Sequence, residues 1–489
     1  MEKYGLYING EWVNSTSGET FESINPATEE VIGIFQKGNK EDVKSAVEAA
    51  ESAFEKWSSA PPPVRGEILF KATEILKTEK ERLGKLVTTE MGKVIAEGLG
   101  DVQEAIDIFE YMAGEGRRLL GHTSTSELHD KFSMTVRRPV GIAGLITPWN
   151  FPIAIPAWKL SAALICGNTV VLKPASDTPL CAVELVKILE RAGLPKGVIN
   201  MVTGSGEEAG TEIATNNRIR VLSFTGSKDA GEFVLKNAGI KRVGLELGSK
   251  NPVIIMDDAD IKLAVDGCIW GGFGTTGQRC TAASRVIVHK NVKEKFEKIF
   301  VERAEALTLG NGIESSTNVG PLINEKAVEK SQKYVDIGNK EGARILCGGE
   351  KAKIDGRGFF YKPTVFTDVK PDMKIAQDEI FGPVVSILEA SSLEEAIKIC
   401  NSVEYGLSSA IYTNNIRNAF KAIEKIDTGI TYINASTIGA EVHLPFGGVK
   451  STGNGTREAG IEGINEFTDT KTVYFDYSGR LQRAQIDVE

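Results

Sequence analysis

The stretch VGIAGLITPWNFPIAIPAWKLSAALICGNTVVLKP, residues 140–174, holds two short apolar runs, GIAGLIT and TVVLKP, that flank a longer apolar segment. Each run has the length of a buried strand, and the segment PAWKLSAALICG between them has the length of a helix. Strand, helix and strand at this spacing are typical of a βαβ unit, in which the two strands lie parallel. The stretch therefore predicts a parallel sheet covered by helices.

The same alternation continues along the chain. VINMVTG at 198–204 and RVLSFTG at 220–226 read as further strands, and NPVIIM at 251–256 opens a second run that extends to ITYIN at 430–434. The predicted fold class is therefore α/β, with two doubly wound parallel-sheet domains. Amphipathic helices precede the first sheet, the last of them over 96–120, and we expect them to coat the sheet without carrying chemistry.

Composition excludes several classes of function. Lysine and arginine total 57 against 66 acidic residues, so the formal net charge is −9. An acidic balance argues against nucleic acid or a membrane surface as the main partner. No apolar run has transmembrane length and the N-terminus lacks the apolar core of a signal peptide, so we expect a cytoplasmic location.

Cysteine spacing indicates reduced thiols rather than a metal site. No CxxC pair and no histidine cluster is present, so neither a zinc site nor a disulfide framework is expected. The cysteines are Cys166, Cys181, Cys268, Cys280, Cys347 and Cys400.

Cys280 ends the glycine-rich segment WGGFGTTGQRC, residues 270–280. Small side chains let a ligand approach closely, and a thiolate is the strongest nucleophile that a side chain offers near neutral pH. The alternative is that Cys280 is a small buried apolar residue, as most cysteines in large proteins are.

Three further residues are candidates for chemistry. Glu246, in the apolar stretch GLELGSKNP, is either a desolvated general base or a structural carboxylate at a domain boundary. Asn150, after Thr-Pro-Trp, either donates to an oxyanion or serves as a turn residue. His443, in EVHLPFGG, either forms a Cys–His dyad or is a wall or surface group.

Two glycine turns stand between predicted strands and helices. Gly226 and Ser227 in SFTGSKDAG place backbone amides where a phosphate can bind, and Gly206 and Gly210 in GSGEEAG do the same. Each is equally well a tight turn. Lys173, in LKPASDTP, either contacts a nucleotide ribose or its 2′-phosphate or is a solvated surface charge.

Together these stretches resemble one family, the NAD(P)-dependent aldehyde dehydrogenases. The resemblance covers almost the whole chain, through INPATEE, TPWNFP, LKPAS, FTGS, LELGSKNP, GQRC, EIFGPV and PFGG. It implies that Cys280 is the nucleophile, Glu246 the general base, and Asn150 with the backbone amide of Cys280 the oxyanion hole. An aldehyde is then oxidised to the acid through a thiohemiacetal and a thioester. One departure is Ser249, where the family usually has glycine.

The resemblance also implies a nicotinamide cofactor. Lys173 and Ser176 resemble its adenosine-ribose contacts, and Glu379 and Phe381 its nicotinamide-ribose contacts. Because Ser176 is uncharged and can hydrogen-bond a 2′-phosphate, NADP is predicted to be preferred, or at least to serve as well as NAD. The predicted cofactor-binding residues are Ile146, Thr147, Pro148, Trp149, Lys173, Ser176, Gly206, Gly210, Phe224, Gly226, Ser227, Leu247, Glu379 and Phe381.

The implied division of the chain follows. Residues 1–120 and 140–247 are expected to form the Rossmann-like dinucleotide-binding domain, and residues 248–447 the catalytic domain. Residues 121–139 read as an extended hairpin, which with 468–489 forms a small β element for oligomerisation. The resemblance implies a homotetramer or a homodimer.

The segment INASTIGAEVHLPFGGVKSTGNG, residues 433–455, resembles members that oxidise semialdehydes of dicarboxylic acids, such as 2-oxoglutarate or succinate semialdehyde. Arg279 either holds the acidic tail or is a buried structural guanidinium that faces away. The predicted substrate-binding residues are Asn150, Phe151, Trp158, Arg279, Thr281, Ile438, His443 and Phe446.

Other functions stay open at this point. An acylating aldehyde dehydrogenase would pass the thioester to coenzyme A, although Glu246 favours hydrolysis. A cysteine hydrolase using Cys280 and His443 would need no nicotinamide, and a non-catalytic relative would keep only the fold.

Overall fold

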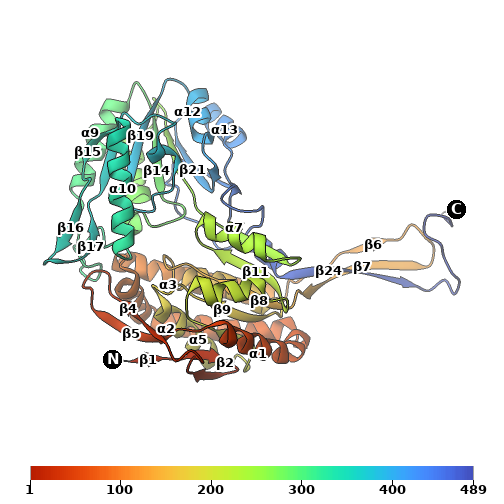
Figure 1. The fold of residues 1–489 in the computed structure, drawn as a ribbon. Coiled ribbons are helices and arrows are strands. Elements are labelled where there is room, and N and C mark those ends of the chain that lie inside the picture. The colour runs from red at the N-terminus through yellow and green to blue at the C-terminus, as the bar shows by residue number, and fades with distance from the viewer. Residues whose placement is uncertain (1, 488–489) are drawn as a thin grey trace.

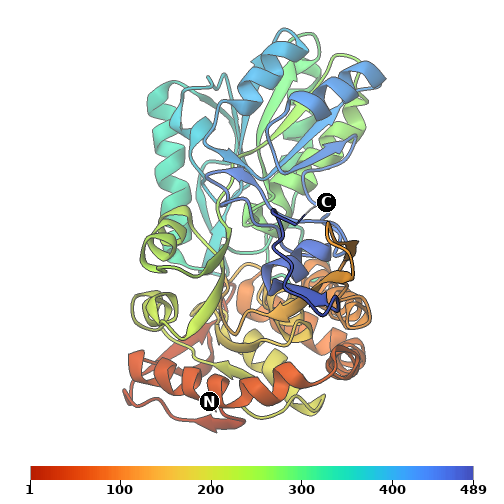
Figure 2. The same cartoon turned by 90° about the vertical axis from the view of Figure 1, so that its right-hand side faces the viewer.

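The computed structural model describes residues 2–487, which form two lobes and a projecting arm (Figure 1). Figure 2 views the molecule from the side of the arm and shows one lobe stacked on the other. Each lobe is built around a seven-stranded sheet. The prediction of an α/β fold with two wound sheets is confirmed.

The first sheet has the strand order β12-β11-β8-β9-β10-β2-β3. The strands from β12 to β10 are parallel, as predicted, but β2 and β3 form an antiparallel hairpin at the edge. The strands are β2 (Leu6–Ile8), β3 (Glu11–Val13), β8 (Ile142–Ile146), β9 (Thr169–Lys173), β10 (Ile199–Met201), β11 (Ile219–Thr225) and β12 (Arg242–Glu246).

Helices bury apolar faces against both sides of this sheet. On one side lie α2 (Pro62–Met91), α3 (Ile95–Glu115), α4 (Ala154–Ile165) and α5 (Pro179–Arg191). On the other side lie α1 (Lys40–Ser59), α6 (Thr211–Thr215) and α7 (Lys228–Asn237). Helix α2 ends at Gly92, whose φ of 95° only glycine adopts without strain. Helix α3 ends at Glu115, before the predicted residue 120. Gly114 and Gly116 interrupt the apolar pattern at this point.

The second sheet has the order β15-β18-β19-β14-β13-β21-β22, and β15 alone among these strands runs antiparallel to its neighbour. The strands are β13 (Asn251–Ile255), β14 (Ala283–His289), β15 (Arg344–Cys347), β18 (Thr364–Thr367), β19 (Val384–Ala390), β21 (Ser408–Tyr412) and β22 (Ile430–Ile433). Its helices are α8 (Ile261–Phe273), α9 (Lys293–Glu305), α10 (Glu325–Glu341), α12 (Leu393–Asn401) and α13 (Ile416–Lys425).

The arm is a three-stranded antiparallel sheet that projects from the side of the lobe that holds β8 and β11 (Figure 1). Its hairpin is β6 (Thr123–Thr125) and β7 (Lys131–Pro139), at the predicted place. Strand β24 (Thr468–Asp476) pairs with the whole length of β7. The arm thus joins two segments far apart in the sequence.

Smaller elements complete the fold. They are the sheet of β1 (Lys3–Tyr4), β5 (Val31–Gln36) and β4 (Thr20–Ile24), the pairs β16 (Lys351–Ile354) with β17 (Arg357–Tyr361) and β20 (Tyr405–Gly406) with β23 (Val449–Lys450), and the helices α11 (Lys374–Gln377) and α14 (Gly460–Glu466). Within residues 2–487, no helix combines the length and apolar character needed to span a membrane.

Candidate active site

Cys280 lies on the segment that connects α8 with β14. A tight 3₁₀ turn, Gly274–Gly277, follows α8, and its central residues Thr275 and Thr276 have φ values of 50° and 57°. Left-handed backbone costs a threonine about 1 to 3 kcal/mol and persists only where neighbours hold it. The Thr275 amide donates to Glu97 Oε1 at 2.7 Å, which ties this strained turn to α3.

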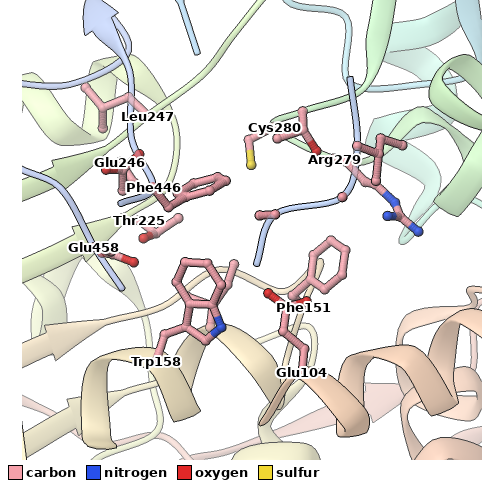
Figure 3. Close-up of a pocket in the computed structure, with 15 residues that line it drawn as sticks. Glu104, Phe151, Trp158, Thr225, Glu246, Leu247, Arg279, Cys280, Phe446 and Glu458 are labelled. Carbon is pink, nitrogen blue, oxygen red and sulfur yellow. The ribbon is translucent and has the colours of Figure 1, made fainter. Parts of the chain in front are cut away.

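Two cavities meet at Cys280. The first, of about 150 Å³, holds the Cys280 sulfur facing aromatic side chains from the other lobe (Figure 3). It is lined by Glu104, Phe151, Ile155, Trp158, Thr225, Glu246, Leu247, Arg279, Cys280, Thr281, Ile438, Gly439, Ala440, Phe446 and Glu458. The second, of about 210 Å³, is lined by Pro148, Trp149, Asn150, Ile155, Thr225, Gly226, Ser227, Leu247, Gly248, Cys280, Lys330, Glu379 and Phe381. A thiol at this junction can contact two different ligands at once.

Glu246 ends β12 and lies in the first cavity with Cys280. Its side chain is buried, and neither carboxylate oxygen has a hydrogen-bond partner in the described structure. Burial, and after it the negative charge of Glu458, raises the pKa of Glu246 well above its ordinary value. Glu458 is itself ion-paired with Lys159. These surroundings are those of a proton acceptor poised for chemistry, since a structural carboxylate would be paired.

The Cys280 thiol is neutral in this arrangement. Burial raises its pKa to about 12, and the charges of Glu246 and Glu379 act in the same direction. The backbone N–H groups of Thr281 and Cys280 oppose this shift. A base must therefore remove the thiol proton before the sulfur can attack.

Asn150 follows β8 and lines the second cavity beside Cys280. Its Nδ2 donates one hydrogen bond, 3.0 Å long, to the Gln278 carbonyl, and its Oδ1 is buried without a partner. An amide nitrogen carries two N–H groups, so one remains available to a developing oxyanion.

The second cavity contains groups suited to part of a nucleotide. Gly226 and Ser227 lie at the N-terminus of α7, where free backbone amides favour a phosphate. A Cβ on Gly226 would stand 2.6 Å from the Phe224 ring, so only glycine fits there. Farther along, the rings of Trp149 and Phe381 meet edge to face at 5.5 Å. Backbone amides can donate to a phosphate, a carboxylate can accept from ribose hydroxyls, and aromatic rings can pack against a nucleotide base.

Lys173 and Ser176 form a separate part of this region. Lys173 is buried and its Nζ donates to the carbonyls of Pro174 at 2.8 Å and Gly204 at 3.1 Å, so the alternative of a solvated surface charge is wrong. Burial lowers its pKa to about 8. Ser176 Oγ donates to the same Gly204 carbonyl at 2.9 Å. Gly210 packs against the Lys173 side chain.

The predicted cofactor residues fall into three groups. Those that line the second cavity are Pro148, Trp149, Gly226, Ser227, Leu247, Glu379 and Phe381. Those near the Gly204 turn are Lys173, Ser176, Gly206 and Gly210. The others, Ile146, Thr147 and Phe224, are buried, and Ile146 and Phe224 belong to the apolar core beneath the site.

Of the predicted substrate residues, six line the first cavity: Phe151, Trp158, Arg279, Thr281, Ile438 and Phe446. The expectation for His443 is wrong. Its side chain is 54% exposed, lies 3.6 Å from Glu441, and is not among the residues that line the cavity. His443 was expected in the cavity because it lies three residues before Phe446 in the sequence. The chain turns between the two residues, so only Phe446 faces the cavity. A Cys280–His443 dyad has no support in this geometry.

Arg279 lines the first cavity but already has a partner. Its guanidinium lies 3.2 Å from Glu97 Oε1 and donates from Nε to Thr275 Oγ1 at 2.8 Å. It also stacks over the rings of Phe151 and Trp270. The guanidinium is therefore a structural group that borders the cavity, and its contact with an acidic tail stays a prediction.

Several cavity residues were missed from the sequence. In the first cavity they are Glu104, Ile155, Thr225, Gly439, Ala440 and Glu458, and in the second they are Gly248 and Lys330. Glu104 places one residue of α3, a helix expected only to coat the sheet, at the cavity. Its only signal was an acidic residue within the apolar face formed by Val102, Ala105 and Ile106.

Comparisons with known proteins identify the family. The sequence profile described as "Aldehyde dehydrogenase family" matches residues 12–473. The chain belongs to the aldehyde dehydrogenase family. An alpha-ketoglutarate semialdehyde dehydrogenase of Haloferax volcanii is 45% identical, over 96% of this chain and 98% of that one. A 2,5-dioxopentanoate dehydrogenase of Saccharolobus solfataricus is 39% identical, over 95% and 97%.

A solved structure extends the comparison to the fold. Betaine aldehyde dehydrogenase from Staphylococcus aureus, in complex with NAD+, superposes with a TM-score of 0.96 at 36% identity, over 98% of this chain and 96% of that one. This aldehyde dehydrogenase is thus an NAD(P)-dependent oxidoreductase that converts aldehydes to acids. The coenzyme A-dependent and hydrolase alternatives are not favoured.

Proposed function

We propose that this aldehyde dehydrogenase oxidises a semialdehyde with an acidic tail to the dicarboxylic acid, using Cys280, Glu246 and Asn150. The observation that carries the catalytic assignment is the position of Cys280, at the junction of two cavities and beside an unpaired buried carboxylate. The names of the relatives in Haloferax volcanii and Saccharolobus solfataricus support the substrate class.

The residues have distinct roles in the proposed reaction. The Cys280 thiol gives its proton to solvent, the thiolate attacks the aldehyde carbon, and the Asn150 N–H and the Cys280 amide stabilise the oxyanion of the thiohemiacetal. When bound, the nicotinamide supplies the acceptor for the hydride that the thiohemiacetal loses. Glu246 then takes a proton from the water that cleaves the thioester, releasing the acid and the thiol.

One assay tests the function. The purified protein is mixed with succinate semialdehyde, 2-oxoglutarate semialdehyde and simple alkanals, with NAD or NADP, and formation of the reduced cofactor is followed with and without coenzyme A. We expect the acid semialdehydes to have the highest kcat/KM and coenzyme A to have no effect. A requirement for coenzyme A, or a preference for neutral alkanals, would contradict the proposal.

We infer that residues 1–120 and 140–247 hold the cofactor and that 248–447 carry the nucleophile. NADP preference follows from Ser176 and Lys173, which share the Gly204 carbonyl. Neither repels a 2′-phosphate, and the ammonium attracts it.

Replacing Ser176 by glutamate tests this cofactor assignment. A carboxylate near a 2′-phosphate is expected to raise the KM for NADP by about 10 to 100-fold, while the KM for NAD changes little. Initial rates at varied cofactor concentration measure both constants. Ser176→Gln, which has nearly the same size without the charge, is the control. An equal rise for both cofactors in Ser176→Glu would refute the assignment.

We also infer that the arm joins subunits of a homodimer or homotetramer. Four large aromatic side chains of the arm are exposed in the single chain: Phe132, Tyr474, Phe475 and Tyr477. Exposed apolar strands of this kind mark interfaces. Sedimentation velocity is expected to give a dimer or a tetramer, and a monomer at micromolar concentration would contradict this inference. The cytoplasmic location stays a prediction.

A further inference from the structure

Glu104 is a carboxyl group in the substrate cavity that the mechanism does not use. It comes from α3, on the side of the cavity opposite Cys280, and its carboxyl group lies between Trp158 and Phe151 and points into the space beneath the sulfur (Figure 3). Arg279 lines the same cavity. An aldehyde bound to Cys280 would therefore direct its tail toward this end.

The charged groups around Glu104 are already matched with one another. Arg279 is paired with Glu97 at 3.2 Å, and Lys93 with Asp101 at 2.9 Å. Within residues 2–487, the Glu104 carboxyl group has neither an ion pair nor a side-chain hydrogen bond, so its oxygens are available to a ligand.

We propose that Glu104 binds the acidic tail of the substrate as a neutral carboxylic acid, its O–H donating to a carboxylate oxygen of the tail. Such a bond is charge-assisted and stronger than one between neutral groups. Binding of the acidic substrate then takes up a proton when Glu104 is ionised in the free enzyme. This inference rests on the proposed acid-tail substrate class.

The electrostatics of the site support a neutral Glu104. Burial raises its pKa to about 7, Asp101 and more weakly Asp107 act in the same direction, and Arg279 and Lys93 oppose them. The other carboxyl groups that line the cavity are those of Glu246 and Glu458. Below neutral pH the Glu104 carboxyl group is a donor; above it, the carboxylate repels the tail.

Steady-state kinetics test the proposal. KM is measured for succinate semialdehyde and for 4-methylpentanal, its neutral isostere, with saturating cofactor between about pH 6 and about pH 9. The quantity compared is the KM for succinate semialdehyde divided by the KM for 4-methylpentanal. If the bound tail raises the pKa of Glu104 by about one unit, this ratio should rise about tenfold from the low to the high end of the pH range. The ratio removes effects of pH on Cys280 and Glu246, which both substrates share.

The variant Glu104→Gln keeps a hydrogen-bond donor at this position but removes the group that ionises. Its amide keeps an N–H donor, so we expect a ratio that stays low and independent of pH. Glu110→Gln, the same change on an exposed position of α3, should behave as the wild type. The proposal would be overturned if the KM ratio of Glu104→Gln rose with pH as steeply as that of the wild type. It would also be overturned if the wild-type KM ratio did not change with pH. A KM for 4-aminobutanal that falls with pH and increases in Glu104→Gln would instead assign Glu104 to cationic tails and also overturn it.

A measurement on the wild type covers the case in which the variant is unstable. Calorimetric titration with 4-hydroxybutanoate, in two buffers of different ionisation enthalpy, should show uptake of about half a proton per site slightly above pH 7. Binding without proton uptake would contradict the proposal. If succinate semialdehyde is a poorer substrate than 4-methylpentanal at every pH, the substrate class itself fails, which is a distinct result.

Discussion

Replacing Cys280 by serine is expected to lower kcat by at least about 10⁴-fold, because a serine hydroxyl is far less acidic and less nucleophilic than a thiol. Burial raises the pKa of the Cys280 thiol to about 12, and the same burial disfavours ionisation of a serine hydroxyl. The environment therefore does not restore the nucleophilicity lost with the sulfur. The rate of formation of reduced nicotinamide with a saturating aldehyde measures the loss.

Two controls separate chemistry from folding in this experiment. Cys280→Ser should keep the Tm and the cofactor affinity of the wild type, since the side chain faces two cavities and the atom change is small. Cys268→Ser, at a fully buried position in α8, should lower Tm because the hydroxyl lacks a partner, yet retain kcat. Turnover by Cys280→Ser at the wild-type rate would remove Cys280 from the mechanism.

Glu246→Gln is expected to stop the reaction at the thioester. Removing this carboxylate deletes the base for hydrolysis, which contributes about 10² to 10⁴-fold to the rate. It also deletes a negative charge that raises the Cys280 pKa, so acylation should survive. A single burst of reduced cofactor followed by slow turnover, and a protein mass increased by the acyl group, are the expected observations.

The pH dependence provides an independent check of Glu246. Its pKa is raised by burial, so the ionised base becomes populated only as pH rises, and wild-type kcat should rise with it when deacylation limits the rate. The slow residual turnover of Glu246→Gln should lack that rise. Full activity in the variant, or a burst absent from a protein whose Tm and cofactor binding are unchanged, would contradict the assignment.

The elements of both sheets could be predicted because the signals are local. Apolar runs of strand length, periodic helices and glycine stops such as Gly92 depend on neighbouring residues only. The antiparallel edges β2–β3 and β15 could not be predicted in the same way. Pairing at a sheet edge is set by which segments meet there, and a short run such as Leu6–Ile8 reads alike in either direction.

The sequence also singles out Asn150, Glu246 and Cys280 as candidates, and the family resemblance implies their roles. Asn150 and Glu246 follow strands of one parallel sheet, whose carboxyl ends must lie at one edge, and Cys280 stands in a motif with few alternatives. The structure adds that this edge faces the second lobe. It also replaces the expected role of His443, since an exposed turn carries that side chain out of the cavity.

Short-range patterning along the chain thus suffices for the α/β class, whereas the roles of the nucleophile, its base and its oxyanion donor are what the family resemblance implies. The pairing of Arg279 with Glu97, 182 positions away, and the presence of Glu104 in the cavity arise only when α3 packs against the other lobe. The spacing of apolar residues along the sequence does not predict such contacts, because they depend on how the surfaces of two lobes pack together. The charges that surround the substrate's tail are therefore a property of the packed lobes.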